Sequence, residues 1–533
     1  MWVKRVCIRG PRSSIVTGVE LYNDSQARTD PAHGDTMINL DGSTLSLSSA
    51  GRVVFVGERV RVDATARARA ERSQRAVARI VSQGKPVYGI NTGLGRLSDR
   101  SVSDERLREL QHNIIRSHAA AVGDPLPEEA VRAILLFRVN SLLKGNSGIR
   151  MEVVDCLVDL LNARIHPVVP AQGSVGSSGD LAPLAHLALV ILGEGEAVQD
   201  GVKLPGKEAL ARVGREPLTL FPKEGLALVN GTQYMSGLGY LAYARGERLL
   251  RAALIAAALS LEALTAFSAP LDERVHAARP HAGQVDVARR LRELLSGSRL
   301  LDTAQDDVQD AYSLRCIPQV LGPAVEALSF LETKLVIEVN ASTDNPLVFP
   351  DGAVLSGGNF HGEILGLALE MATMALAEVG SLAERRIDRL LASPGRGLPP
   401  FLAHEPGLES GLMLAQYTAA ALVSENKVLC HPAVVDSIPT SGGKEDHNSM
   451  GSISARKALA VLDNLERVIA VEFLCAAQAL DFRGKDGMAP RTRKAHERVR
   501  SLVVHVGCDR PLSSDIERLA VAVRSGEIVD GLL

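Results

Sequence analysis

The sequence predicts a mainly α-helical protein organised around a long helical bundle. Apolar residues recur at spacings of three and four through 235–328, through the 360s to the 380s, and through 411–428, the pattern of helices that bury one face. Alanine and leucine are abundant, while aromatic residues make up only 3% of the chain. This composition suits tightly packed helices better than a β-sandwich.

The first half is expected to alternate short helices with glycine-rich loops. Residues 64–81 have helical spacing, and Pro86 with the glycines of VYGINTGLG then form a loop that contains Tyr88. Residues 106–121 are helical by period and carry His118 near their end. A further helix is predicted after Asp180, a residue that favours the N-cap position, with Pro183 in its first turn.

The second half reads as the bundle. Residues 249–269 form its most apolar segment, but Arg251 and Glu262 interrupt them, so a buried bundle helix is expected rather than a membrane span. One irregular polar segment, VQDAYSLRCIPQVLG, precedes the later helices, and a long helix is predicted over 453–480. Residues 1–36 are polar, lack periodicity and are expected to be a disordered tail, with Met37 as an alternative start.

The net charge and the cysteines of the chain indicate which class of ligand it binds and which cellular compartment it occupies. The chain has 59 Lys and Arg against 62 Asp and Glu, so no basic surface indicates nucleic acid and a small-molecule ligand is expected. No secretory signal is expected either. Six scattered cysteines without a CxxC pair predict free thiols in a reducing, cytoplasmic setting: Cys7, Cys156, Cys316, Cys430, Cys475 and Cys508.

The segment 171–184, AQGSVGSSGDLAPL, implies chemistry that ordinary side chains do not supply. Gly179 has no Cβ, so its backbone nitrogen can approach the carbonyl of Ser177 and close a five-membered ring. If Ser178 then loses water, the ring carries a methylene group conjugated to a carbonyl, which is an electrophile. By composition alone the more common outcome is a simple turn before a helix. The segment does not match the GxSxG elbow, and no GxxxxGK[ST] loop occurs in the chain.

Several islands of sequence resemble the aromatic amino acid ammonia-lyases and aminomutases. They occur in the family's order over residues 37–533 and include GSVGSSGDLAPLAH, YGINTGLG, KEGLALVNGTQ, SGGNFHGE and TSGGKEDHNSMG. The resemblance implies a 4-methylidene-imidazol-5-one (MIO) group formed autocatalytically from Ser177, Ser178 and Gly179, with no external cofactor. Ser177 stands where the family has Ala, which leaves the ring atoms unchanged.

The resemblance also implies the architecture. It divides the chain into an MIO-bearing domain at 37–220, a central bundle at 221–490 and a C-terminal helical segment at 491–533. Family members are homotetramers whose sites combine loops from three chains, so a homotetramer is expected.

The same resemblance implies the site residues, although each of them also has a simpler structural interpretation. A loop tyrosine, a helix histidine or an Asn-Gly turn is most often structural. By resemblance Tyr88 removes the substrate β-proton, which requires a lowered pKa of its phenol. Asn230 supports the MIO ring, and Arg315 holds the substrate carboxylate. His118 and Glu445 contact the aromatic ring of the substrate. The remaining residues carried over are Gln309 and Tyr312 in the substrate site and Phe360 against the MIO ring.

His118 and Glu445 favour L-histidine as the substrate and trans-urocanate as the product. The alternatives are a tyrosine or phenylalanine ammonia-lyase, a 2,3-aminomutase, or a non-catalytic helical assembly protein. Lys444 stands where the family often has Gln and bears on specificity. His361, His404, His431 and His447 lack HExxH-type spacing, so no metal site is predicted.

Overall fold

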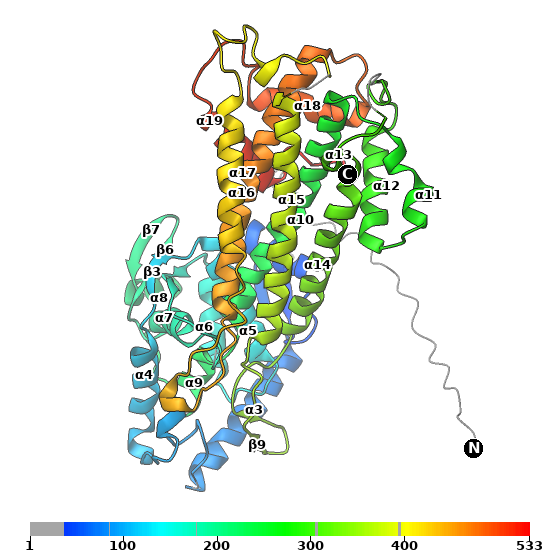
Figure 1. The fold of residues 1–533 in the computed structure, drawn as a ribbon. Coiled ribbons are helices and arrows are strands. Elements are labelled where there is room, and N and C mark those ends of the chain that lie inside the picture. The colour runs from blue at the N-terminus through cyan, green and yellow to red at the C-terminus, as the bar shows by residue number, and fades with distance from the viewer. Residues whose placement is uncertain (1–36, 85, 177, 304–307, 393–395) are drawn as a thin grey trace, which may run out of the picture.

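The computed structural model describes residues 37–84, 86–176, 178–303, 308–392 and 396–533. It confirms a mainly helical protein, with a tall bundle and a smaller N-terminal part at the lower end of the view in Figure 1. The predicted tail at 1–36 lies outside the described residues. The division of the chain at 220/221 and 490/491 stays a prediction.

Long helices running side by side make the bundle (Figure 1). Their apolar faces meet along its length, as the spacing of three and four predicts. Nearly all residues of α10 are buried, which confirms that 249–263 belongs to a bundle helix. The main helices are α10 (Gln233–Ala263), α12 (Ala282–Leu295), α14 (Ile317–Glu338), α15 (Glu363–Ala392), α16 (Met413–Leu429) and α17 (Gly451–Arg483).

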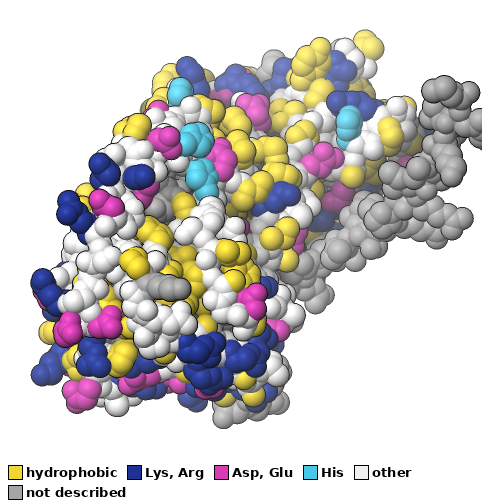
Figure 2. All heavy atoms as spheres, turned by 90° about the horizontal axis from the view of Figure 1, so that it is seen from below, with side chains coloured by type: hydrophobic (Ala, Val, Ile, Leu, Met, Phe, Trp, Pro, Cys, Tyr) yellow, Lys and Arg dark blue, Asp and Glu magenta, His cyan; other side chains and the backbone are white. Residues whose placement is uncertain are grey.

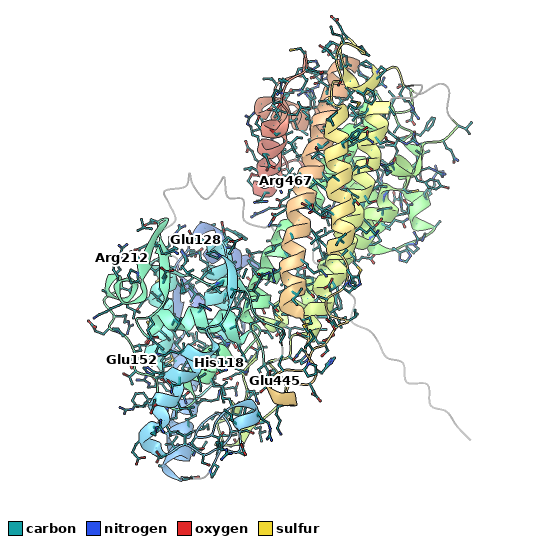
Figure 3. The ribbon with its side chains drawn as sticks, turned by 60° about the vertical axis from the view of Figure 1, so that its left-hand side comes forward. His118, Glu128, Glu152, Arg212, Glu445 and Arg467 are labelled. Atoms are coloured by element: carbon teal, nitrogen blue, oxygen red, sulfur yellow. The ribbon has the colours of Figure 1, made fainter. Side chains whose placement is uncertain are left out.

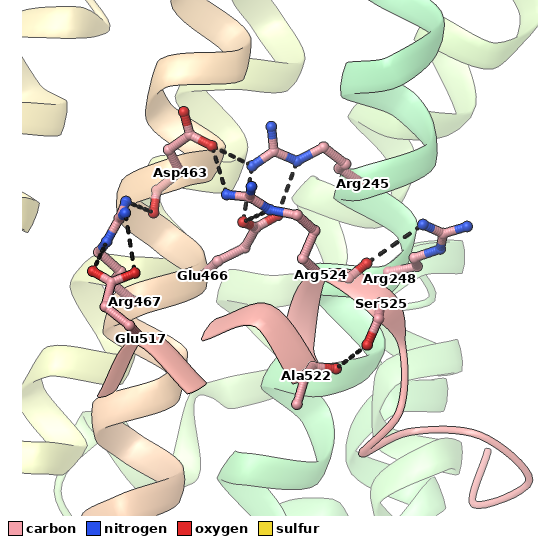
Figure 4. A network of polar contacts seen from close by, with 9 residues as sticks. All are labelled: Arg245, Arg248, Asp463, Glu466, Arg467, Glu517, Ala522, Arg524 and Ser525. Carbon is pink, nitrogen blue, oxygen red and sulfur yellow. Dashed lines mark hydrogen bonds and ion pairs between the residues drawn. The ribbon is translucent and has the colours of Figure 1, made fainter. Parts of the chain in front are cut away.

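Ion pairs connect the last helix of the chain to this bundle. Arg245 of α10 and Arg524 of α19 (Ser513–Ser525) both reach Asp463 and Glu466 of α17 (Figure 4). The Arg245 guanidinium lies 2.6 Å from Asp463 and 2.8 Å from Glu466. Because Glu466 is buried, two guanidinium groups compensate its charge better than one would. The remaining helix of this end, α18 (Pro490–Leu502), packs against α10, α12 and α17.

The N-terminal part combines short helices with small sheets. β1 (Ile38–Leu40) pairs in parallel with β2 (Val60–Val62), while β3 (Val122–Pro125) with β5 (Pro170–Gln172) and β4 (His166–Pro167) with β6 (Glu196–Gln199) and β7 (Val202–Pro205) are antiparallel. Its helices are α2 (Leu47–Gly51), α3 (Ala64–Ser82), α4 (Leu107–His118), α5 (Glu128–Leu143), α6 (Met151–Asn162), α7 (Leu181–Ile191), α8 (Gly206–Arg212) and α9 (Glu224–Val229). The predicted helices at 64–81, at 106–121 and after Asp180 are thereby confirmed.

Short elements occupy the segments between the long helices. β8 (Leu347–Val348) and β9 (Val354–Leu355) form a hairpin before α15, and α11 (Glu273–Ala277) precedes α12. The segment predicted to be irregular contains α13 (Tyr312–Arg315) and the first turns of α14. The four-residue α13 is too short to show a helical period in sequence.

Within the part of the chain that the structure describes, one helix, α15, is long and apolar enough to cross a membrane by length and composition alone. Here it lies in the bundle against α14, α16 and α17, so its apolar residues serve helix packing. Among the described cysteines, five are free thiols as predicted: Cys156, Cys316, Cys430, Cys475 and Cys508.

Candidate active site

A cavity of about 540 Å³ opens where the N-terminal part meets the lower end of the bundle. The glycine-rich loop after α3, the helix α4, the start of α7, the end of α9 and the segment 441–445 all line it. Hydrophobic side chains gather in the middle of this end of the molecule, with charged side chains around them (Figure 2). The fold thus brings together five residues that the sequence singled out: Tyr88, His118, Ser178, Asn230 and Glu445.

Gly179 allows its backbone to lie unusually close to the backbone of a distant segment, at Gly231. Its φ is +76°, and a Cβ on it would lie 2.3 Å from the carbonyl oxygen of Gly231. The two glycines form a parallel bridge, and the next backbone N–H, that of Asp180, donates to the Gly231 oxygen at 2.7 Å. Only glycine fits here without moving that backbone. Ser177, the first residue of the predicted ring, lies outside the described residues.

Asn230 holds the carbonyl group of Ser178. Its Nδ2 donates to that oxygen at 2.7 Å, and its own backbone oxygen accepts from the guanidinium of Arg138 at 2.6 Å. Arg138 is fully buried in α5, and this burial lowers its pKa to about 10. A donor aimed at the Ser178 carbonyl would stabilise negative charge that develops on that oxygen.

Asp180 occupies the N-cap position of α7, as the sequence predicted, but its side chain makes no capping hydrogen bond. Its carboxylate turns away from the helix and accepts from the Ser174 hydroxyl and from the backbone N–H of Met235, both at 2.9 Å. The local pattern identified the start of the helix, but partners distant in sequence compete for the side chain. Complete burial raises the pKa of Asp180 to about 7, although these hydrogen bonds and Arg138 act in the opposite direction.

Glu445 is held at both carboxylate oxygens. The hydroxyl of Ser178 donates to Oε1 at 2.6 Å, and the hydroxyl of Thr440 donates to Oε2 at 2.8 Å. The short helix η6 (Ser441–Gly443) lies between Thr440 and Glu445. His118, at the end of α4, lines the same cavity as Glu445, and Figure 3 labels both residues at this end of the molecule.

The environment shifts the pKa values of His118 and Tyr88, which also line the cavity. Burial lowers the pKa of His118, against the raising effect of Glu445, which favours a neutral imidazole. Burial raises the pKa of Tyr88, and the charge of Glu445 adds to that rise, while the Gly95 N–H opposes it. A tyrosine base requires the reverse direction, which a nearby positive charge or dipole would supply.

The other substrate-site residues are placed elsewhere. Gln309, Tyr312 and Arg315 belong to or precede α13, which lies at the far end of the bundle from α4 and α9 (Figure 1). The Tyr312 side chain is 69% exposed, and the Arg315 guanidinium lies 4.6 Å from the centre of its ring. One chain therefore does not bring these residues to the cavity.

Phe360 occupies an intermediate position. It is half-buried and precedes α15, and the next residue, His361, reaches the backbone oxygen of His447 at 3.3 Å. This places the Phe360 segment beside the segment that carries Glu445. Phe360 itself does not line the cavity.

Sequence reasoning missed Arg138, Thr440 and Asn345, all at or behind the cavity. Arg138 interrupts the apolar run of α5, and a charged residue on a buried helix face is a signal that could have identified it. Thr440 and Asn345 stand in loops, where no period indicates which side chains turn inward.

Comparisons with known proteins agree with this site. A family model described as aromatic amino acid lyase matches residues 45–501. The histidine ammonia-lyase of Geobacillus sp. (strain WCH70) is 51% identical over 487 residues, which is 91% of this chain and 96% of that protein.

Solved structures extend the comparison to the fold. The histidine ammonia-lyase of Trypanosoma cruzi aligns with a TM-score of 0.86 at 43% identity, over 93% of this chain and 96% of that one. The tyrosine aminomutase of Streptomyces globisporus aligns with a TM-score of 0.89 at 41% identity, over 92% of this chain and 98% of that one.

Proposed function

Because the chain belongs to the aromatic amino acid lyase family, we propose that it removes ammonia from L-histidine and releases trans-urocanate. The observation that carries this proposal is the 51% identity to a histidine ammonia-lyase over 91% of the chain. The site adds chemical support, because a neutral histidine and a carboxylate, His118 and Glu445, line one cavity. Together they suit a polar ring that both donates and accepts hydrogen bonds.

We propose that Ser177, Ser178 and Gly179 supply the MIO group. The described residues fit it, because the close approach of Gly231 excludes any side chain at Gly179 and Asn230 donates to the Ser178 carbonyl. When formed, the group is an electrophile that makes the substrate amino group a better leaving group.

The roles of the remaining cavity residues follow from their positions. Tyr88 takes the proton from the substrate β-carbon, and His118 with Glu445 orients the ring. Asn230 holds the carbonyl oxygen that belongs to the ring-forming tripeptide. The carboxylate of Glu445 accepts from Ser178 and Thr440 in this structure, and formation of the MIO group would remove the Ser178 hydroxyl from Oε1.

We propose that a complete site requires more than one chain, in a homotetramer. Arg315 would hold the substrate carboxylate, with Gln309, Tyr312 and Phe360 around it. The distance between α13 and the cavity supports a second chain as their source (Figure 1), as does the exposure of Tyr312. A cation brought by that chain would also lower the pKa of Tyr88, against the effect of its own chain. A cytoplasmic location accords with the free thiols.

A 2,3-aminomutase is the second candidate. The tyrosine aminomutase of Streptomyces globisporus has nearly the same fold at 41% identity. An aminomutase returns ammonia to the β-carbon, so the products distinguish the two reactions. A non-catalytic assembly protein is the third candidate, and it would keep the full mass of the unprocessed chain.

A substrate panel tests the proposal. Purified protein is incubated with L-histidine, L-tyrosine and L-phenylalanine, and the release of ammonia and of ultraviolet-absorbing product is followed. We expect ammonia and urocanate from L-histidine in equal amounts. Turnover of only tyrosine or phenylalanine, or formation of a β-amino acid, would refute the assignment.

A further inference from the structure

A cluster of metal-ligating side chains lies beside the cavity and takes no part in the proposed reaction. His361, Glu363 and His447 each offer a ligand atom, and these atoms lie within 4.8 Å of one another. His361 and Glu363 stand at the start of α15, and His447 is two residues beyond Glu445. Figure 2, which faces this end of the molecule, shows histidine and acidic side chains close together on the surface.

One hydrogen bond in the cluster bears on which nitrogen of His361 could bind a metal. The Nε2 of His361 faces the backbone oxygen of His447 at 3.3 Å, and a carbonyl oxygen only accepts. Nε2 therefore donates in this contact, and Nδ1 is the ring nitrogen that would bind the metal. A metal-binding histidine commonly has this arrangement, with the other ring nitrogen donating to a carbonyl.

Glu363 supplies the second independent observation. Its Oε2 is buried and has no hydrogen-bond partner among the described residues. A buried carboxylate oxygen without a partner is costly, and a cation would satisfy it. The rings of His361 and His447 are stacked, within 10° of parallel and with centroids 5.7 Å apart, so the two histidines lie next to each other.

We propose that His361, Glu363 and His447 bind a divalent transition metal of the Zn²⁺ class. Two nitrogens and one carboxylate oxygen form a donor set that zinc prefers, with a fourth position for water. Ligands about 2.1 Å from one metal lie no more than about 4.2 Å apart, so a small rotation of the exposed His447 closes the set. The inference departs from the expectation that the sequence, which lacks HExxH-type spacing, contains no metal site.

Metal binding would join two segments that are far apart in sequence. It links the first turn of α15, next to Phe360, to the loop that carries Glu445. The proposal does not depend on the lyase reaction, because none of the three ligands is assigned a role in it. A bound metal would stabilise this junction and raise the melting temperature in proportion to the logarithm of its concentration.

The test is metal titration of the full chain without a histidine tag. Protein treated with a chelator is titrated with Co²⁺, followed by its visible absorption, and with Zn²⁺ by calorimetry. We expect one metal per chain. His361→Ala, His447→Ala and Glu363→Gln should each weaken binding by at least about tenfold, because even outer-shell partners of metal ligands contribute tenfold or more. His431→Ala, which removes an exposed histidine outside the cluster, should leave binding unchanged.

Two further readouts keep the result decisive. Circular dichroism and melting without metal establish that each variant is folded. Ser178→Ala protein, which lacks the ring-forming serine, should bind the metal with unchanged affinity, so failure of the lyase proposal and failure of the metal proposal are distinguishable. Absence of binding, or binding that survives both histidine substitutions, would overturn the inference and leave Glu363 as an acidic residue at a helix N-terminus.

Discussion

The residues assigned to the proposed site lie at two ends of this molecule, and these ends differ in how they are organised. The lower end gathers Ser178, Asn230 and Glu445 around one cavity, with short hydrogen bonds between them. The far end presents Tyr312 and Arg315 on a short helix with the tyrosine largely exposed. One end is organised within a single chain and the other is left open. This difference supports the proposal that a complete site takes residues from more than one chain.

The largest expected effect concerns the organised end. Ser178→Ala removes the hydroxyl whose loss creates the methylene group, so kcat/KM for L-histidine should fall by at least about 10⁴-fold. Intact mass gives a second readout, because wild-type chains should be lighter than their sequence by two waters and the variant should not. Unchanged turnover in a folded variant would contradict the proposed electrophile.

A smaller effect is expected at the open end. Arg315→Ala should raise KM for L-histidine and lower kcat/KM by roughly 10²-fold, since it removes the partner of a buried carboxylate. The mass deficit of two waters should remain, because α13 lies far from the tripeptide in the same chain (Figure 1). Normal kinetics in this variant would remove Arg315 from the site.

Ring preference should respond more weakly still. Glu445→Gln exchanges a charged acceptor for a neutral amide, so kcat/KM for L-histidine should fall by roughly 10- to 100-fold. Thr440→Ser, which keeps the hydroxyl that donates to Glu445, provides the matched control and should retain most activity. The account fails at this position if Glu445→Gln lowers turnover of tyrosine and histidine equally.

The smallest expected effect is a change in the pH dependence of the melting temperature, caused by Asp180 near the cavity. The pKa of Asp180 is raised to about 7 by burial, so its favourable contribution to folding is present at low pH and is lost as the pH rises through about 7. Asp180→Asn removes this titration. The melting temperature of the variant relative to wild type should therefore rise between pH 4 and pH 7, and a constant difference would show that the carboxyl stays ionised.

The sequence predicted the bundle better than the site. Long helices such as α17 repeat their apolar spacing for many turns, so their existence follows from local pattern. The side chain of Asp180 shows where this reasoning stops, because its acceptor role depends on Met235, more than fifty residues later. The position of the cap was predicted correctly, but its side chain bonds a tertiary partner in place of the first turn of the helix.

Only the resemblance to the family predicted that the site residues lie together around one cavity. Nothing in the spacing of Tyr88, Ser178 and Glu445 indicates that three loops meet, since loops carry no period. The close contact of Gly179 with Gly231 likewise appears only when the two segments are seen together. The position of Arg315, far from the cavity in its own chain, depends on helix arrangement and could not be read from a motif.

Mixing two inactive variants tests the composite site most directly. Chains with Ser178→Ala and chains with Arg315→Ala are unfolded together, refolded as mixed oligomers and assayed with L-histidine. If each site takes its tripeptide from one chain and its arginine from another, roughly a quarter of the sites in a random mixture are intact and activity returns. If the mixture stays as inactive as its parents while both variants assemble normally, each chain builds its own site and the account is wrong.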